Sequence, residues 1–322
     1  MKSEEFASAI LFLTIFGAFG IEIWWKMRTF ALSIMAISTL SILIPTYNDV
    51  CTSLVTALHQ QAEKLDLSYE IIVADDGSTD PHVKETNHTI NTLPHCRLIE
   101  MQENAGRAAI RNFLAKEAQY DWLLFIDSDM VVCRNDFLQK YIQTDDYPVV
   151  DGGVSIGPCI PDNLRSIYER ASAHEHTVEK RRQKPYQDFH TANFLIRHDL
   201  MLAYPFNQQF RYYGYEDVLF GKELEQHAIP ICHIDNPLSF EIFESNTDFV
   251  NKMEEGLRTL HQFQDELRGY SRLLDITNRL PHFPFRLWHK LFGRLERRNL
   301  TGSHPSLWIF KIYKLGYFLS LP

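Results

Sequence analysis

An apolar run that ends in two aspartates constrains the fold of this chain more than any other feature. Residues 122–126 (WLLFI) are all apolar, which is typical of a central strand covered on both faces. Asp127, Ser128 and Asp129 follow directly. In an open α/β sheet, ligands bind in the crevice beyond the carboxyl ends of the strands. The two carboxylates are therefore interpreted either as ligands of a divalent cation such as Mg²⁺ or Mn²⁺, or as helix-capping residues that face solvent.

Strand-like and helix-like segments alternate through the middle of the chain. Strands are expected at 41–44, 69–74, 97–101, 122–126, 149–150, 193–197 and 229–234, and helices at about 50–65, 104–118 and 216–227. Short loops join these segments, as in a mostly parallel sheet with helices on both faces. The predicted fold class is therefore α/β, with a Rossmann-like sheet flanked by helices and followed by a C-terminal helical tail.

Hydropathy and the α/β pattern divide the chain into three parts, at residues 1–34, 35–256 and 257–322. Within the first part, residues 6–25 are long and apolar enough to span a bilayer, with Glu22 as their one charge. This segment is interpreted either as a membrane anchor or as an extension upstream of a start at Met27 or Met35. An anchor would leave the rest of the chain on the cytoplasmic side of the membrane, by the positive-inside rule.

The C-terminal part differs in charge from the rest of the chain. Residues 257–322 carry 11 Lys and Arg against 4 Asp and Glu, about +7, whereas the whole chain has a net charge of −9. Basic and aromatic residues stand side by side there, as in helices that lie on a membrane surface. The alternative is a helical subdomain that packs on the core with a basic outer face. The negative net charge argues against nucleic acid as a partner.

Four polar motifs are expected at one edge of the predicted sheet. They are residues 45–48 (PTYN), 75–80 (DDGSTD), 104–112 (NAGRAAIRN) and 127–129 (DSD). Each follows a predicted strand or opens the helix after one, so the four should line a common crevice. A fifth motif, residues 214–217 (GYED), opens a later helix.

These motifs, in this order, resemble the family 2 glycosyltransferases, inverting enzymes with the GT-A fold. The similarity spans about residues 41–239. It implies transfer of a sugar from a nucleotide-diphosphate donor, most simply a UDP-sugar, to an acceptor hydroxyl. It also implies Mn²⁺ or Mg²⁺ as cofactor. The expected acceptor is a glycan or a lipid-linked molecule, in cell-surface polysaccharide or glycolipid assembly at the membrane.

The resemblance also implies which residues bind the donor. The candidates are Pro45, Thr46, Tyr47, Asp76, Arg107, Arg111, Asp127 and Ser128. The Asp76 carboxylate is expected to read a uracil ring, whereas Asp75 is open to a structural role through Asx-type hydrogen bonds. Arg107 and Arg111 stand four residues apart on one helix face. They are expected either to clamp phosphate or to form salt bridges with Asp75 or Asp76.

Metal and catalytic roles are expected for the remaining acidic residues. Asp129 would bind the cation directly, Asp127 would bind it or the ribose, and His233 is a candidate third ligand at the end of a later strand. Of the pair at the next helix start, Asp217 is expected to be the catalytic base and Glu216 to orient the acceptor, although the sequence leaves this assignment open. The helix dipole alone would also favour two carboxylates there.

Two further segments are open to a structural or a functional interpretation. Residues 190–194 (HTANF) resemble the family segment that borders the donor sugar, and Asn193 is expected either to bond a sugar hydroxyl or to have an edge-strand role. Residues 168–184 are rich in His, Lys and Arg and are expected to form a solvated charged face, with a mobile loop over the donor as the alternative.

Two rival functions are less consistent with the sequence. A nucleotidyltransferase of similar fold would need a glycine-rich loop with Arg and Lys after the first strand, which residues 45–48 (PTYN) do not provide. A non-catalytic sugar-nucleotide-binding or scaffold protein would be expected to have lost a motif, and all five are intact.

Overall fold

The computed structural model describes residues 37–144 and 147–322, and the predicted N-terminal part lies outside them. The strands are β1 (Thr39–Thr46), β2 (Ser68–Asp75), β3 (Cys96–Glu100), β4 (Trp122–Ile126), β5 (Met130–Val131), β6 (Val149–Asp151), β7 (Val154–Ile156), β8 (Asn193–Arg197), β9 (Ile231–His233) and β10 (Leu238–Phe240). The helices before the tail are α2 (Thr52–Ala62), α3 (Pro81–His88), α4 (Arg107–Glu117), α5 (Phe137–Ile142), α6 (Leu164–Ser172), α7 (Val178–Gln183), α8 (His198–Ala203) and α9 (Glu216–Gln226), with short 3₁₀ turns at Thr89–Thr92 and Ala173–Glu175.

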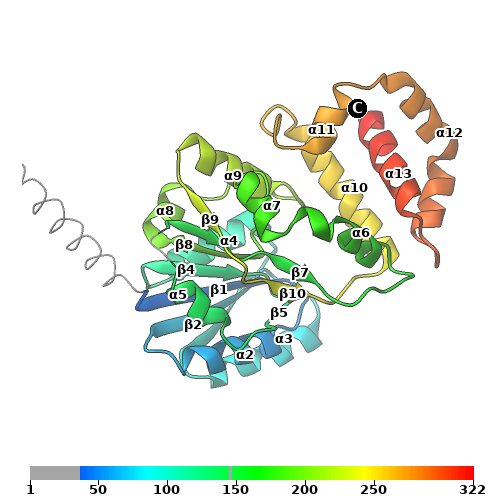
Figure 1. Ribbon diagram of the computed structural model, residues 1–322. Helices are drawn as coiled ribbons and strands as arrows, with labels where there is room; N and C mark the ends of the chain where they lie inside the picture. The colour runs from blue at the N-terminus through cyan, green and yellow to red at the C-terminus, as the bar shows by residue number, and fades with distance from the viewer. Residues whose placement is uncertain (1–36, 145–146) are drawn as a thin grey trace, which may run out of the picture.

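Seven strands form the main sheet, in the order β3-β2-β1-β4-β8-β6-β9 (Figure 1). The pairs β1–β2, β1–β4, β2–β3 and β6–β9 are parallel, and β8 runs antiparallel to both of its neighbours. The predicted α/β class with a mostly parallel sheet is therefore confirmed. A second, three-stranded sheet, β5-β10-β7, was not predicted, because its strands have only two or three residues each.

Alternation along the strands places apolar side chains on both faces of the sheet. Leu40, Ile42 and Ile44 of β1 belong to the cluster that also contains α2 and α5 residues, whereas Leu43 belongs to the cluster with α4, α8 and α9 residues. Successive side chains of a strand point to opposite faces, so a strand covered on both sides must be apolar throughout. The carboxyl ends of β1, β2 and β4 consequently meet at one edge, where the polar motifs begin.

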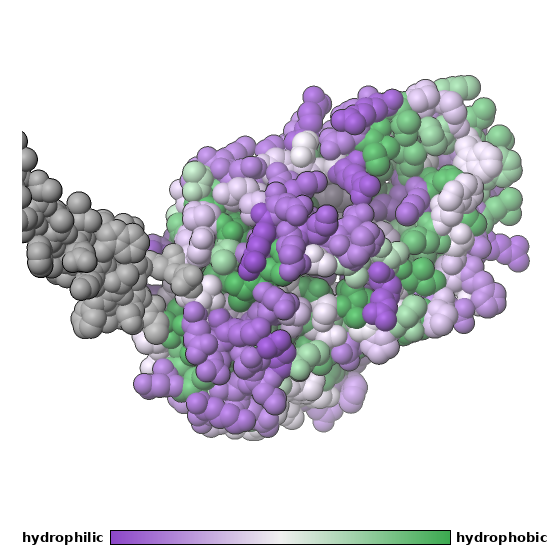
Figure 2. Space-filling model, viewed as in Figure 1, coloured by the Kyte–Doolittle hydropathy of each residue, from purple (hydrophilic) through white to green (hydrophobic). Residues whose placement is uncertain are grey.

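The tail folds into the helices α10 (Asn246–Gln262), α11 (Arg272–Thr277), α12 (His282–Leu300) and α13 (Leu307–Ser320). The predicted boundary between residues 256 and 257 is wrong, because it falls inside α10. A third apolar cluster joins α10 and α13 to Leu164 of α6 and Leu219 of α9. The tail therefore packs on the α/β part. Figure 2 shows that apolar residues also gather on its outer surface.

No helix within residues 37–144 and 147–322 has the length and apolar character needed to cross a bilayer.

Candidate active site

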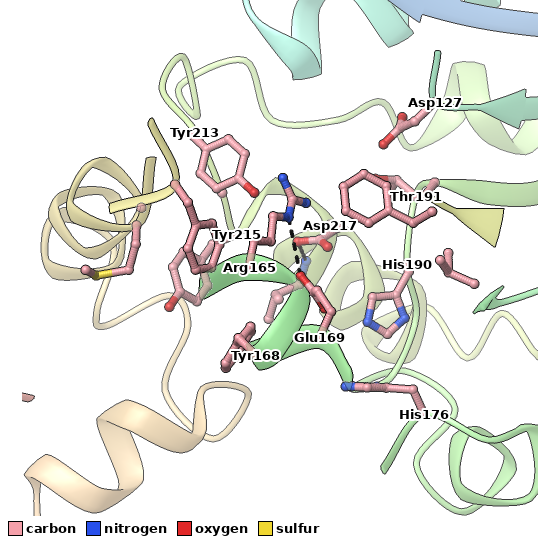
Figure 3. A pocket seen from close by; sticks show the side chains of 18 of the residues that line it. Asp127, Arg165, Tyr168, Glu169, His176, His190, Thr191, Tyr213, Tyr215 and Asp217 are labelled. Atoms are coloured by element: carbon pink, nitrogen blue, oxygen red, sulfur yellow. Dashed lines mark hydrogen bonds and ion pairs between the residues drawn. The ribbon is translucent and has the colours of Figure 1, made fainter. Parts of the chain in front are cut away.

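A cavity of about 450 Å³ lies between the sheet edge and the tail helices. It is lined by Asp127 and Asp129 after β4, Arg107 of α4, Arg165, Tyr168 and Glu169 of α6, His190 and Thr191 before β8, Tyr213 to Asp217, Phe249 and Met253 of α10, and Phe310 and Lys314 of α13. Figure 3 shows that acidic, basic and aromatic side chains from these separate elements surround one space. The cavity thus unites the DSD and GYED motifs, as the sequence predicted.

The central strand β4 ends at this cavity, so both aspartates of the DSD motif lie in its wall. Asp127 Oδ1 accepts a hydrogen bond from Arg111 Nη2 at 2.6 Å. Burial, together with the neighbouring Asp127 carboxylate, raises the pKa of the Asp129 carboxyl to about 6. Two carboxylates so close together repel each other, and a cation bound between them would relieve that repulsion. Their hard oxygen atoms therefore fit Mg²⁺ or Mn²⁺.

Arg111 is buried beneath the site and pairs with two acidic residues of different motifs. Besides Asp127, its Nη1 lies 3.5 Å from Glu216 Oε1, and the Arg111 residue is 1% exposed. The half-exposed Arg107 lies 3.9 Å from the same Glu216 oxygen. Burial raises the pKa of the Glu216 carboxyl, an effect to which the Asp217 carboxylate adds, while the two guanidinium groups act against it. Arg111 thus forms salt bridges, one of the two alternatives, although its partners are not in the 75–80 motif.

Asp217 differs from Glu216 in having no ion-pair partner in the described parts of the chain. It lines the cavity, and its Oδ1 accepts a hydrogen bond from the Val218 backbone N–H at 2.8 Å. Tyr215, the N-cap of α9, has a left-handed backbone with φ of 69°, and Gly214 before it has φ of 92°. This turn presents both carboxylates at the helix start. Because Glu216 is held by two arginines, the geometry favours Asp217 as the free base.

The 75–80 loop is fixed by hydrogen bonds within the loop and to the start of the 104–112 motif. Asp75 Oδ1 accepts a hydrogen bond from the Ser78 N–H at 2.8 Å. This is the structural role that the sequence left open for Asp75. Both oxygens of Asp76 are also engaged, with the N–H groups of Ala105 at 2.8 Å and Gly106 at 3.0 Å. Asp76 is 4% exposed. It therefore links the loop to the start of α4, and this geometry does not support its predicted role as the reader of a uracil ring.

The other predicted donor-binding residues lie at the same sheet edge but do not line the cavity. Thr46 pairs with Asp75 across β1 and β2, and its hydroxyl donates to the Asp49 carbonyl at 3.0 Å. Tyr47 follows it with 48% of its surface exposed. Pro45 and Ser128 are partly buried beside them. The role of these four residues in donor binding stays a prediction.

Gly106 is required where the backbone turns into α4, the helix that carries both arginines. Its φ of 92° and ψ of 161° suit glycine alone, and an added Cβ would lie 2.7 Å from the Arg211 carbonyl oxygen. We expect Gly106→Ala to lower the free energy of unfolding by more than about 2 kcal/mol, measured by urea denaturation.

Gly269 provides the matched control for this substitution. Its φ is 82°, yet no atom lies within 4 Å of an added Cβ. Gly269→Ala should therefore cost about 1 kcal/mol, from backbone strain alone. Equal losses in the two variants would show that contact with the Arg211 carbonyl has no part in the effect.

The structure does not bring the His233 side chain to Asp127 and Asp129, which corrects the prediction that His233 is a third metal ligand. Its Nδ1 lies 3.0 Å from Arg181 Nη1 and its Nε2 lies 2.9 Å from the Pro185 carbonyl oxygen. Both ring nitrogens are thus engaged, in a side chain that is 1% exposed. Within the described residues, no three His, Cys, Asp or Glu side chains are grouped so as to hold a metal ion.

Each of the two open segments contains residues with structural roles, although other residues of both segments line the cavity. The Asn193 amide bonds the Tyr141 hydroxyl at 2.7 Å and the Gly153 carbonyl at 2.8 Å, in the central strand β8 instead of an edge strand. Arg181 was expected on a solvated face, but it is 3% exposed and its Nη1 lies 2.8 Å from Asp151 Oδ1. The same segment brings His176 to the cavity wall.

Sequence reasoning missed the part of the cavity made by α6 and the tail. Arg165 lies 3.6 Å from Glu169, one helical turn away, and its guanidinium group lies over the Phe240 and Phe249 rings at 4.3 and 5.8 Å. Lys314 Nζ reaches the cavity from α13, 5.4 Å from the centre of the Phe310 ring. These residues belong to no motif, and only the four-residue spacing of Arg165 and Glu169 gave a signal in the sequence.

Comparison with known proteins relates the chain to one family. The family model described as "Glycosyl transferase family 2" matches residues 41–213. An "Uncharacterized glycosyltransferase" of Haemophilus influenzae is 33% identical over 111 residues, which are 34% of this chain and 42% of the relative. The "Dolichyl-phosphate beta-glucosyltransferase" of Dictyostelium discoideum is 30% identical over 132 residues, 36% of this chain and 40% of the relative. The chain thus covers less than half the length of either relative.

A solved structure shares the fold. Residues 1–349 of S. aureus TarS, in complex with UDP-GlcNAc, align over 88% of this chain and 90% of that chain with a TM-score of 0.50 and 17% identity. The resemblance seen in the motifs is confirmed, because the family model covers more than half of the sequence. The chain therefore belongs to glycosyl transferase family 2.

Proposed function

We propose that this protein transfers a sugar from a nucleotide-diphosphate donor, a UDP-sugar, to an acceptor hydroxyl with inversion at the anomeric carbon. The observation that carries the proposal is the shared cavity. It places the Asp127 and Asp129 carboxylates and the unpaired carboxylate of Asp217 around one space. Such a space can hold the leaving diphosphate and the attacking hydroxyl at the same time, as an in-line displacement requires.

A divalent cation fits the donor set at the DSD motif. Asp129 and Asp127 would hold Mn²⁺ or Mg²⁺, and the raised pKa of Asp129 reflects burial and a nearby negative charge that such a cation would offset. When bound, the cation would neutralise charge on the departing diphosphate. His233 is left out of this ligand set because its ring nitrogens are occupied.

The protein residues supply the proton transfer and the positioning. Asp217 takes the proton of the acceptor hydroxyl as the oxygen bonds to the anomeric carbon, and the bond from that carbon to the diphosphate breaks on the opposite side. Glu216, held by Arg107 and Arg111, fixes the geometry of the GYED turn. Its buried Oε2 has no hydrogen-bond partner in the described residues, which leaves it free to orient an acceptor hydroxyl.

The relatives suggest the class of acceptor. One acts, by its name, as a dolichyl-phosphate beta-glucosyltransferase, and another is a "Chondroitin synthase" of Escherichia coli, 31% identical over 125 residues. A lipid-linked or glycan acceptor in polysaccharide or glycolipid assembly fits both. The aromatic side chains of Tyr168, Tyr213 and Phe310 in the cavity would suit the apolar face of such an acceptor sugar.

Turnover of the donor alone tests the proposed function. The full chain is incubated with UDP- and GDP-sugars in turn, with Mn²⁺ or Mg²⁺, and release of the nucleoside diphosphate is followed. Slow, metal-dependent release from one donor would support the transferase assignment and identify the sugar. Release from none of them, without metal-dependent binding of UDP or GDP, would instead support a non-catalytic role.

Asp129→Asn should weaken the Mn²⁺-dependent binding of UDP by at least about tenfold, because it removes one of the two proposed ligand carboxylates. Isothermal titration calorimetry, with and without a chelator, measures this change. Asp121→Asn is the matched control, since Asp121 is an exposed aspartate just before β4 at the opposite end of the same strand. Equal Mn²⁺ dependence in Asp129→Asn and the native protein would remove Asp129 from the ligand set.

A further inference from the structure

The outer side of α12 carries a row of apolar side chains that nothing in the described chain covers. Phe283, Leu287, Leu291 and Leu295 stand four residues apart, and their exposed fractions are 74%, 44%, 63% and 63%. Residues at this spacing follow one face of a helix. Trp288, one residue after Leu287, is exposed as well, with an exposed fraction of 44%.

A basic row runs beside the apolar one. Arg286, Lys290, Arg294 and Arg298 also stand four residues apart, three positions after the members of the apolar row. All four are exposed, and none forms an ion pair with another described residue. The single acidic residue of α12 and α13, Glu296, is buried and accepts a hydrogen bond from Trp288 Nε1 at 2.8 Å. We call the two rows, with Trp288, the α12 face.

The opposite side of α12 is already packed, so the apolar row is not needed to hold the helix. Gly293, Glu296 and Leu300 are buried there. His289 lies against α13, with its ring 5.1 Å from that of Tyr313, and Arg297 bonds Glu254 of α10 at 2.9 Å. A helix fixed on its inner side and apolar on its outer side needs another partner for that outer side.

We propose that the α12 face docks on the surface of an anionic lipid bilayer. Charge complementarity carries this choice, because four unpaired cations lie beside the apolar row and no exposed acid lies among them. Leucine and phenylalanine would enter the acyl boundary, Trp288 would lie at the headgroup level, and the basic row would contact lipid phosphates. A second copy of this chain is a poorer occupant, since two such faces would bring like charges together.

Docking in this way would also bring the tail helices that line the cavity to the lipid surface. α13 packs against α12 and contributes Phe310 and Lys314 to the cavity wall. Figure 1 shows the tail helices side by side at one end of the molecule. A lipid-linked acceptor would then meet the protein at the surface on which it docks. The docking surface itself does not depend on the proposed function, and it would exist in a non-catalytic protein as well.

Hydrogen exchange of the α12 amides tests the proposal on the full chain. The apolar residues 6–25 are a second candidate for lipid contact, so the readout must be local to residues 282–300. Vesicles of phosphatidylcholine alone are compared with vesicles of equal parts phosphatidylcholine and phosphatidylglycerol. We expect protection of 282–300 on the anionic vesicles only. Arg286→Gln/Lys290→Gln/Arg294→Gln should raise the lipid concentration for half-protection roughly a hundredfold.

Lys64→Gln/Lys116→Gln/Lys180→Gln is the control, because it removes the same charge from exposed positions elsewhere. It should leave the protection of α12 unchanged. The proposal is overturned if anionic vesicles do not protect α12, or if neutral vesicles protect it as well as anionic vesicles do. It is also overturned if the α12 triple variant is protected at the same lipid concentration as the native chain. Protection that instead grows with protein concentration in the absence of vesicles would assign the face to a second copy of the chain.

Discussion

Asp217→Asn should reduce the turnover of the donor by about 10²- to 10⁴-fold, the usual contribution of a general base. The substitution removes the one cavity carboxylate of the GYED motif that no arginine holds, while the Asn side chain keeps nearly the same shape. UDP binding in the presence of Mn²⁺ should be unchanged, because Asp217 belongs to the acceptor side of the proposed reaction. Release of UDP and calorimetric binding of UDP measure the two quantities separately.

Glu169→Gln is the matched control within the same cavity. Glu169 also lines the wall, but it lies 3.6 Å from Arg165, so it is not expected to act as a base. Its turnover should stay within a few-fold of the native value. If Asp217→Asn retained full turnover while Glu169→Gln lost it, the base would have to be reassigned to α6.

Arg111→Met should lower the free energy of unfolding by about 3–5 kcal/mol. The loss follows from the two buried contacts of the guanidinium group, at 2.6 Å to Asp127 and 3.5 Å to Glu216. Removing the buried cation leaves Asp127 without its ion-pair partner and leaves the buried Glu216 with only the more distant Arg107. Urea denaturation followed by circular dichroism gives the value, and Arg111→Lys should fall between the native protein and the Met variant because one ammonium group cannot replace both contacts.

Arg107→Met is the control for that measurement. Its side chain is 47% exposed and 3.9 Å from Glu216, so its loss should cost less than about 1 kcal/mol. A cost for Arg111→Met as small as that for Arg107→Met would mean that the pairing of Arg111 with Asp127 and Glu216 contributes little to stability.

Much of the fold could be predicted from the sequence because the strands are covered on both faces. Such strands read as continuous apolar runs, and β4 was predicted with the bounds that it has in the structure. β5, β7 and β10 were missed because a strand of two or three residues has no periodicity to detect. Their pairing depends on partners that are distant in the sequence.

The candidate site was predicted only in part, and the errors have one cause. A motif predicts which residue types gather at a sheet edge, but not which of their atoms are already engaged. Asp76 has the expected place, yet both of its oxygens bond the start of α4. His233 has the expected strand end, yet its ring faces Arg181 and Pro185. Hydrogen bonds of this kind join residues tens of positions apart and leave no local pattern.

The sequence by itself determined the α/β class, the order of the motifs and the identity of the acidic residues, because strand burial and helix capping are local and periodic. Only the tertiary structure shows that Glu216 lies near two arginines about a hundred positions away, whereas Asp217 has no ion pair with a described residue. It also decided which side of α12 remains exposed. The sequence shows two rows on that helix, but the packing of His289, Gly293 and Leu300 against the other tail helices decides which side faces outward.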